Sequence, residues 1–78
     1  MTINRVLSIG TRVRIKGSPS GIQLRADTGK IIRQDEMDGY VIVHLDEPAI
    51  SYDDPGTEKE ISEIVEAADN LDVIEPAR

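Results

Sequence analysis

The sequence predicts an all-β domain, a small barrel of about five antiparallel strands. Residues 12–16 alternate strictly between Arg or Lys and Val or Ile, which is the pattern of a half-buried strand. Residues 28–46 hold two runs rich in β-branched side chains, separated by a polar segment that ends in Asp38 and Gly39. That arrangement predicts a β-hairpin. Gly- and Pro-containing turns divide the chain into four or five such short runs, as in small barrels.

The composition predicts one small domain with an aliphatic core. The chain has 78 residues, so residues 1–78 are expected to fold as a single unit. It has neither Phe nor Trp and only two Tyr, so Ile, Val and Leu must fill the interior. The absence of Cys excludes disulfides, thiolate catalysis and Cys-ligated zinc.

Charge is distributed unevenly along the chain. Residues 1–33 carry seven bases and one acid, a balance of +6, whereas residues 34–78 carry two bases and fourteen acids, a balance of −12. In one interpretation the two halves fold together and partly neutralise each other. In the other, faces of opposite sign survive folding and serve a partner or a second copy.

The first third of the chain contains one clear strand. Residues 1–9 are predicted to form a lead-in arm, either loose or a short edge strand, and Gly10 marks a turn. Residues 12–16 form the first strand, with Val13 and Ile15 facing inward. Residues 17–21 are a loop by composition, and residues 22–27 are expected to continue it, with Ile22 or Leu24 reaching the core.

The hairpin over residues 28–46 has an inner and an outer face. If the alternate residues Val41, Val43 and Leu45 face inward, the residues between them face outward: Tyr40, Ile42 and His44. A three-residue loop over 37–39 would pair Glu36 with Tyr40, keep Ile31 inward and leave Ile32 on the outer face. A two-residue turn at Asp38 and Gly39 would instead bury Ile32. We favour the three-residue loop, and we expect a positive φ at Gly39.

The acidic half is harder to assign. Pro48 is expected to end the hairpin strand, because proline cannot donate to a ladder, and residues 50–60 are expected to form an acidic loop. Residues 60–68 fit either a short amphipathic helix or a short strand. Residues 67–70 are predicted to be a tight turn or a single 3₁₀ turn, and residues 71–74 a last strand that Pro76 stops.

Four segments together resemble the SH3-like barrels: residues 10–15, 28–34, 40–45 and 70–74. Residues 10–15 (GTRVRI) and 27–32 (DTGKII) are similar to the KOW module. They also look like electron-transport accessory barrels such as photosystem I subunit IV and the small chain of ferredoxin–thioredoxin reductase. In these families a glycine at the position of Gly29 lets the second strand bend sharply. The resemblance implies a binding protein, whose partner is RNA or ribosomal protein in the first family and partner subunits in the second.

No catalytic pattern is present in the sequence. His44 is the only histidine and lies in an apolar strand, where a structural or interface role is commoner than a catalytic one. Two groups of acids, residues 35–38 and 53–58, fit turn and loop positions better than the fixed ligand spacing of a calcium loop. No phosphate-binding motif follows the loop glycines. We therefore expect no enzyme, cofactor or metal.

Two surfaces are candidates for partner binding. The outward stripe of Ile32, Tyr40, Ile42 and His44 is a possible protein interface. The bases of the first half form a possible nucleic-acid patch: Arg12, Arg14, Lys16, Arg25, Lys30 and Arg33. The leading hypothesis is a cytoplasmic, non-catalytic protein that binds another protein or a second copy, with no membrane segment. A KOW-like nucleic-acid module and an accessory subunit of an electron-transfer complex are the alternatives.

Overall fold

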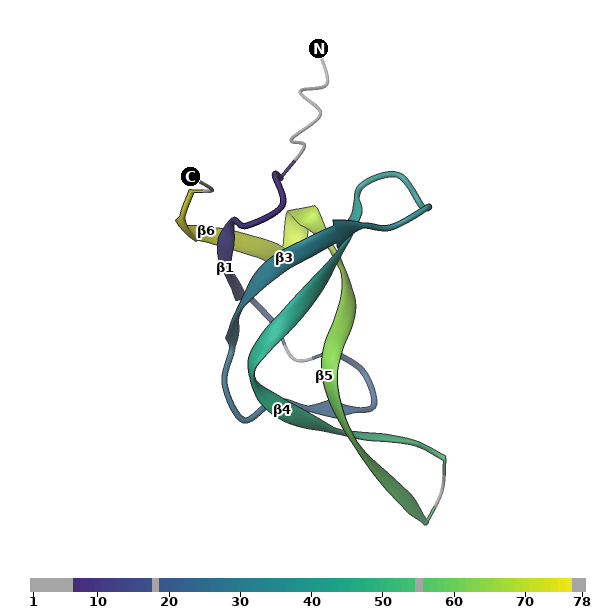
Figure 1. Cartoon of the computed structure of the whole chain (residues 1–78). Helices are drawn as coiled ribbons and strands as arrows, with labels where there is room; N and C mark the ends of the chain where they lie inside the picture. The colour runs from purple at the N-terminus through teal and green to yellow at the C-terminus, as the bar shows by residue number, and fades with distance from the viewer. Residues whose placement is uncertain (1–6, 18, 55, 77–78) are drawn as a thin grey trace.

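The computed structural model describes residues 7–17, 19–54 and 56–76, which form one antiparallel six-stranded sheet (Figure 1). The strands are β1 (Arg12–Ile15), β2 (Ile22–Gln23), β3 (Thr28–Gln34), β4 (Tyr40–Asp54), β5 (Thr57–Ala67) and β6 (Leu71–Glu75). A 3₁₀ turn, η1 (Ala68–Asn70), connects the last two strands. The predicted all-β class and the 3₁₀ turn are confirmed. The described residues include no helix with the length and apolar character needed to cross a membrane.

The sheet is organised around the long strand β4. Strands β3, β4 and β5 form an antiparallel meander, and β1 pairs with β3 on one edge and with β6 on the other. The short strand β2 pairs with the distal part of β4, at Ile50 and Ser51. β4 therefore contacts β3 along its first half and β2 along its second, while β5 accompanies both halves.

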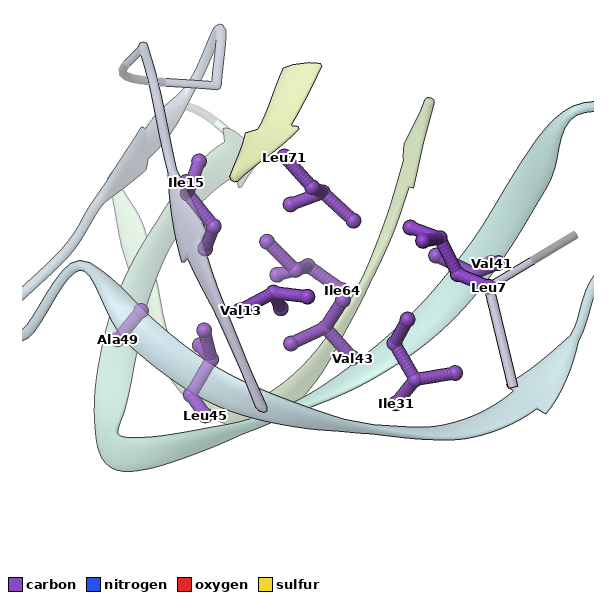
Figure 2. Packing of buried hydrophobic residues seen from close by; sticks show 10 residues of the cluster. All are labelled: Leu7, Val13, Ile15, Ile31, Val41, Val43, Leu45, Ala49, Ile64 and Leu71. Atoms are coloured by element: carbon purple, nitrogen blue, oxygen red, sulfur yellow. The ribbon is translucent and has the colours of Figure 1, made fainter. Parts of the chain in front are cut away.

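The core is aliphatic, as the composition predicts, and Figure 2 shows its side chains pointing toward one another. They come from β1, β3, β4, β5 and β6, and from Leu7 ahead of β1. Val13, Ile31 and Val43 are completely buried. The buried set is Leu7, Val13, Ile15, Ile31, Val41, Val43, Leu45, Ala49, Ile64 and Leu71. The alternating pattern of the first strand and the hairpin thus assigned the inner face correctly.

The connection before the hairpin is more ordered than predicted. Ile22 and Leu24 both pack against the core, and Ile22 begins the two-residue strand β2, so residues 22–27 are not simply a loop. Residues 1–6 of the predicted arm lie outside the described residues. Beyond them Leu7 is buried, and its carbonyl accepts a hydrogen bond of 3.2 Å from Gln34 Nε2.

The hairpin loop is one residue longer than predicted. The Asp35 N–H donates to the Tyr40 carbonyl at 3.1 Å, so Asp35 rather than Glu36 lies opposite Tyr40. Within the four-residue loop the Tyr40 N–H donates to the Met37 carbonyl, and Gly39 has a φ of +84°. The positive φ at Gly39 is confirmed, and the three-residue loop is wrong.

A β-bulge keeps Ile31 on the inner face. Without it, the longer loop would place Ile31 opposite His44, on the outer face. The register shifts between Ile31, which opposes Val43, and Arg33, which opposes Ile42. The extra residue, Ile32, is half-buried in the bulge. A bulge inserts one residue without a partner and so restores the inner face. Ile31 is therefore buried as predicted, although the reason differs from the one that the sequence suggested.

Pro48 does not end β4, contrary to the prediction. The β4–β5 register shifts between His44, which opposes Glu63, and Ala49, which opposes Ile61. Four residues of β4 thus lie against one residue of β5, and the strand bends sharply there (Figure 1). Pro48 lies inside this unpaired section, so its missing N–H costs no ladder bond to β5. Ala49, just beyond it, is completely buried.

The predicted acidic loop over residues 50–60 is a β-hairpin. Ile50 pairs with Glu60, and Asp54 pairs with Thr57 across a turn in which Gly56 has a φ of +81°. A ribbon that projects from the rest of the sheet (Figure 1) needs no apolar face, and its sequence therefore looks like that of a loop.

The strand alternative for residues 60–68 is correct and the helix is wrong. Ile64 is buried and Ile61 packs against the core, although three positions separate them. In a regular strand such residues would face opposite sides. The register shift beside Ser62 turns both Ile61 and Ile64 toward the core. Their spacing in the sequence is therefore the same as that of two residues on one face of a helix.

Candidate functional site

The outer face of β4 carries the side chains that the sequence placed there. Tyr40 is 37% exposed, Ile42 is half-buried and His44 is exposed. Their neighbours along the chain, Val41 and Val43, are buried on the other face. The alternation of the strand therefore separates an aliphatic inner face from a mixed outer face.

Strand β5 extends this surface with residues that the sequence did not identify. Ala67 lies opposite Tyr40, and Val65 lies opposite Ile42. Val65 is 53% exposed and Ala67 is half-buried. We call Tyr40, Ile42, Val65 and Ala67 the outer strip. Val65 was missed because its outward direction is defined only once residues 60–68 are known to be a strand.

Charged and polar groups border the outer strip on one side. His44 lies between Lys30 of β3 and Glu63 of β5 in the register. Arg33 Nη2 of β3 lies 3.7 Å from Glu63 Oε1, which links the two strands that flank β4. At the other end the loop residue Met37 is 61% exposed. Ile32 does not oppose Ile42, because the bulge gives that position to Arg33.

The predicted basic patch is largely paired with carboxylates. Four of its members lie 3.6–3.9 Å from an acid: Arg14 from Asp27, Lys16 from Asp72, Arg25 from Glu60 and Arg33 from Glu63. Arg12 pairs with Asp46 at 2.7 Å. Only one of the five acids, Asp27, comes from the basic half, so the two halves of the chain partly neutralise each other locally. Among the described residues Lys30 has no such ion pair.

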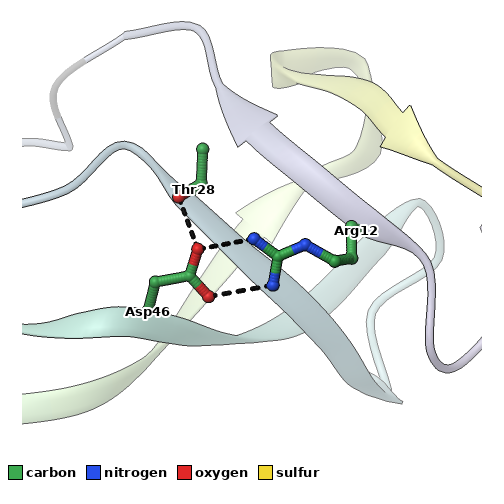
Figure 3. Close-up of polar contacts among 3 residues, drawn as sticks. All are labelled: Arg12, Thr28 and Asp46. Carbon is green, nitrogen blue, oxygen red and sulfur yellow. Dashed lines mark hydrogen bonds and ion pairs between the residues drawn. The ribbon is translucent and has the colours of Figure 1, made fainter.

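A hydrogen-bonded cluster of three polar side chains joins three adjacent strands on the outer face. Figure 3 shows Asp46 of β4 between Arg12 of β1 and Thr28 of β3. Arg12 donates from Nη1 to Asp46 Oδ1 at 3.1 Å and from Nη2 to Oδ2 at 2.7 Å, and Thr28 Oγ1 donates to Oδ2 at 2.5 Å. The hydrogen bond from Arg12, followed by that from Thr28, lowers the pKa of Asp46 from its ordinary value of 3.8. Sequence alone could not align these residues without the register.

The lowered pKa of Asp46 predicts an acid-sensitive contribution to stability. A carboxyl whose pKa is lower in the folded state stabilises the fold above its unfolded pKa of 3.8, and this contribution is lost as the pH falls through the folded value. Asp46→Asn should therefore melt at a lower temperature than the original chain at pH 7, and the difference should shrink in acid. Thermal unfolding followed by circular dichroism at pH 7 and below pH 3 measures both values.

Asp27→Asn is the matched control for Asp46→Asn. Asp27 lies 3.6 Å from Arg14, and both side chains are more than half exposed, so this surface pair adds little stability. The melting temperature of Asp27→Asn should therefore equal that of the original chain at each pH. If the difference in melting temperature between Asp46→Asn and the original chain did not change with pH, the negative charge of Asp46 would not be what stabilises the cluster.

A shallow groove lies at the end of β1, on the side of the connection to β3. It has a volume of about 440 Å³ and is lined by Ile15, Lys16, Gly17, Leu24, Arg25, Ala26 and Asp27. Its two lining bases, Lys16 and Arg25, form ion pairs with Asp72 and Glu60, respectively. In the part of the chain that the structure describes, no three His, Cys, Asp or Glu residues gather as metal ligands would.

Comparison with other proteins does not assign this domain. A scan against protein-family models gave no match, and neither the curated proteins nor the solved structures contain one that matches the chain. The function therefore has to be inferred from the surface of the domain itself.

Proposed function

We propose that the chain is a non-catalytic protein-binding module, an adaptor or accessory subunit with an SH3-like architecture. Three features support that architecture. β1 pairs with both β3 and β6, strands β3 to β5 form a meander, and a 3₁₀ turn precedes the last strand. SH3-like barrels serve many unrelated roles, so the function rests on the surface rather than on this likeness.

The outer strip is the observation that carries the proposal. Single exposed apolar residues are normal on any protein, but here two apolar residues of β4 lie directly opposite two of β5. Strands hold them in fixed positions, and Arg33, Glu63 and His44 form a polar border. An apolar centre with a polar rim is the usual anatomy of a protein interface.

The ion pairs favour a protein partner over a nucleic acid. A phosphate that approached Arg12 would have to displace a bidentate carboxylate. Four other bases of the predicted patch also face acids, so phosphate binding would cost existing charge pairs at each contact.

A photo-crosslinking amino acid at position 40 tests the proposal. Benzoylphenylalanine in place of Tyr40 should give specific protein adducts on irradiation of the cells that make this chain. Tyr52 is the matched control, because it is also a tyrosine of β4 and is 44% exposed, but it bonds Gln23 Oε1 through its hydroxyl at 2.9 Å and lies outside the outer strip. Adducts of equal yield at both positions, or none at position 40, would contradict the proposal.

A further inference from the structure

We infer that the free edge of β5 at residues 63–67 binds a basic, extended segment of the partner protein as an added strand. This inference rests on the proposed function, since the edge borders the outer strip. It specifies the chemistry of the partner and its mode of binding, which is pairing of main chains along a sheet edge.

The hydrogen-bond pattern shows which main-chain groups face that edge. The Ala68 N–H donates to the Gly39 carbonyl at 2.7 Å, toward β4. In an antiparallel pair the N–H and C=O groups of successive residues point alternately toward and away from the neighbouring strand. The groups of Glu66 and Ile64 therefore face β4, and those of Glu63, Val65 and Ala67 face away from it.

These outward groups have no strand beside them in the described structure. β5 pairs with β4 alone among the described strands. The register is regular from Glu63 to Ala67, where each residue has one partner on β4. The Ala67 N–H donates to the side chain of Glu66, at 3.3 Å. The segment thus presents the N–H and C=O groups of Glu63 and Val65 and the C=O of Ala67 to an incoming strand, and the Ala67 N–H can exchange its bond to Glu66 for one to that strand.

Charge determines which kind of strand this edge accepts. Residues 63–67 contain Glu63 and Glu66 and no base, and the whole chain has a net charge of −6. Glu63 already lies 3.7 Å from Arg33, but both side chains are exposed, so this weak surface pair leaves Glu63 able to attract a second cation. Pairing with a second copy would bring four carboxylates together. A strand with Lys or Arg beside these acids is favoured instead, because opposite charges on neighbouring strands attract. Val65, which is 53% exposed, favours a β-branched neighbour on the same face.

A designed peptide tests the inference on the full chain. The probe is a ten-residue peptide with the order Val-Lys-Val-Val-Lys repeated twice, which in an antiparallel pair places Lys beside Glu66 and Glu63 and Val beside Val65. It is titrated into the isotope-labelled protein while amide NMR signals are followed. The largest shifts should fall on Glu63, Val65 and Ala67. The same peptide with alternate main-chain nitrogens methylated keeps its charge but loses its edge donors, so it should bind about tenfold more weakly or worse. A peptide with Glu in place of Lys should not bind.

Variants of Val65 provide a second measurement. Val65→Pro removes an outward N–H without removing a bond to β4, whereas Val65→Thr keeps that N–H and the β-branched shape. The first should weaken peptide binding and the second should not. Equal binding of the methylated and unmethylated peptides would overturn the inference, since charge alone would then hold the peptide. A stable dimer of the free chain in light scattering would overturn it as well, because a second copy would occupy the edge.

The two proposals fail separately. If position 40 crosslinks to a protein and the peptide does not bind, the edge inference is wrong and the binding function stands. If the peptide binds the edge and position 40 gives no adduct, the outer strip is not an interface.

Discussion

Replacing Gly29 with Ala should destabilise the domain severely. A Cβ atom at this position would lie 2.5 Å from the carbonyl oxygen of His44 and 2.7 Å from Cγ1 of Val43. The first obstacle is main chain of the neighbouring strand, which cannot move without distorting the β3–β4 ladder. We expect a loss near the upper end of the range for overpacking, about 3 kcal/mol, and a drop of roughly 12–24 °C in melting temperature. Urea unfolding and thermal melts measure both values.

Gly17→Ala is the matched control for this change. A Cβ atom at Gly17 would have as its nearest neighbour Asn70 Oδ1, at 3.8 Å, which is ordinary contact. This variant should stay within about 0.5 kcal/mol of the original chain, the usual range for surface substitutions. If Gly29→Ala behaved like Gly17→Ala, the close approach of β3 to β4 at Gly29 would be wrong.

Gly29 also explains how β3 can lie so close to β4 at this point. It is paired with Val13 on one side and Leu45 on the other, and both of these side chains are buried. The resemblance to SH3-like barrels predicts that this glycine lets the strand bend. The structure adds a steric reason, because no other residue leaves room for the His44 carbonyl.

The inner face of the sheet was predictable because alternation is local. In residues 12–16 only Val13 and Ile15 are aliphatic, and in residues 40–45 one set of alternate residues is wholly aliphatic whereas the other contains Tyr40 and His44 beside Ile42. A strand turns alternate side chains to opposite faces whatever its partners are. The core positions Val13, Ile15, Val41, Val43 and Leu45 could therefore be assigned before any pairing was known.

The outer face depends on register, which the sequence does not contain. The cluster of Arg12, Thr28 and Asp46 joins residues up to 34 positions apart. Neither the bulge at Ile32 nor the register shift near Pro48 has a marker in the sequence that fixes its position. Val65 belongs to the outer strip because the register of β5 against β4 places it opposite Ile42. The residues that form a site on the outer face of a sheet are therefore determined by how the strands pair, and the amino-acid composition of each strand does not identify them.

Gly39→Val tests the turn that sets the register of β3 against β4. Gly39 has a φ of +84°, and a Cβ atom there would meet nothing within 4 Å, so the cost is main-chain strain and not crowding. We expect a loss of about 1–3 kcal/mol, or roughly 4–8 °C in melting temperature for each kcal/mol. A domain of this size has on the order of 5 kcal/mol in total, so the variant should be visibly destabilised in a thermal melt.

Gly39→Asn separates strain from the mere addition of a side chain. Asparagine tolerates positive φ far better than a β-branched residue, so this variant should melt well above Gly39→Val. Equal melting temperatures for the two would mean that the new side chain, and not the main-chain conformation, causes the loss. If Gly39→Val melted within about a degree of the original chain, the turn would lie elsewhere. The pairing of Asp35 with Tyr40, the outward direction of Tyr40 and Ile42, and the interface built on them would then fall together.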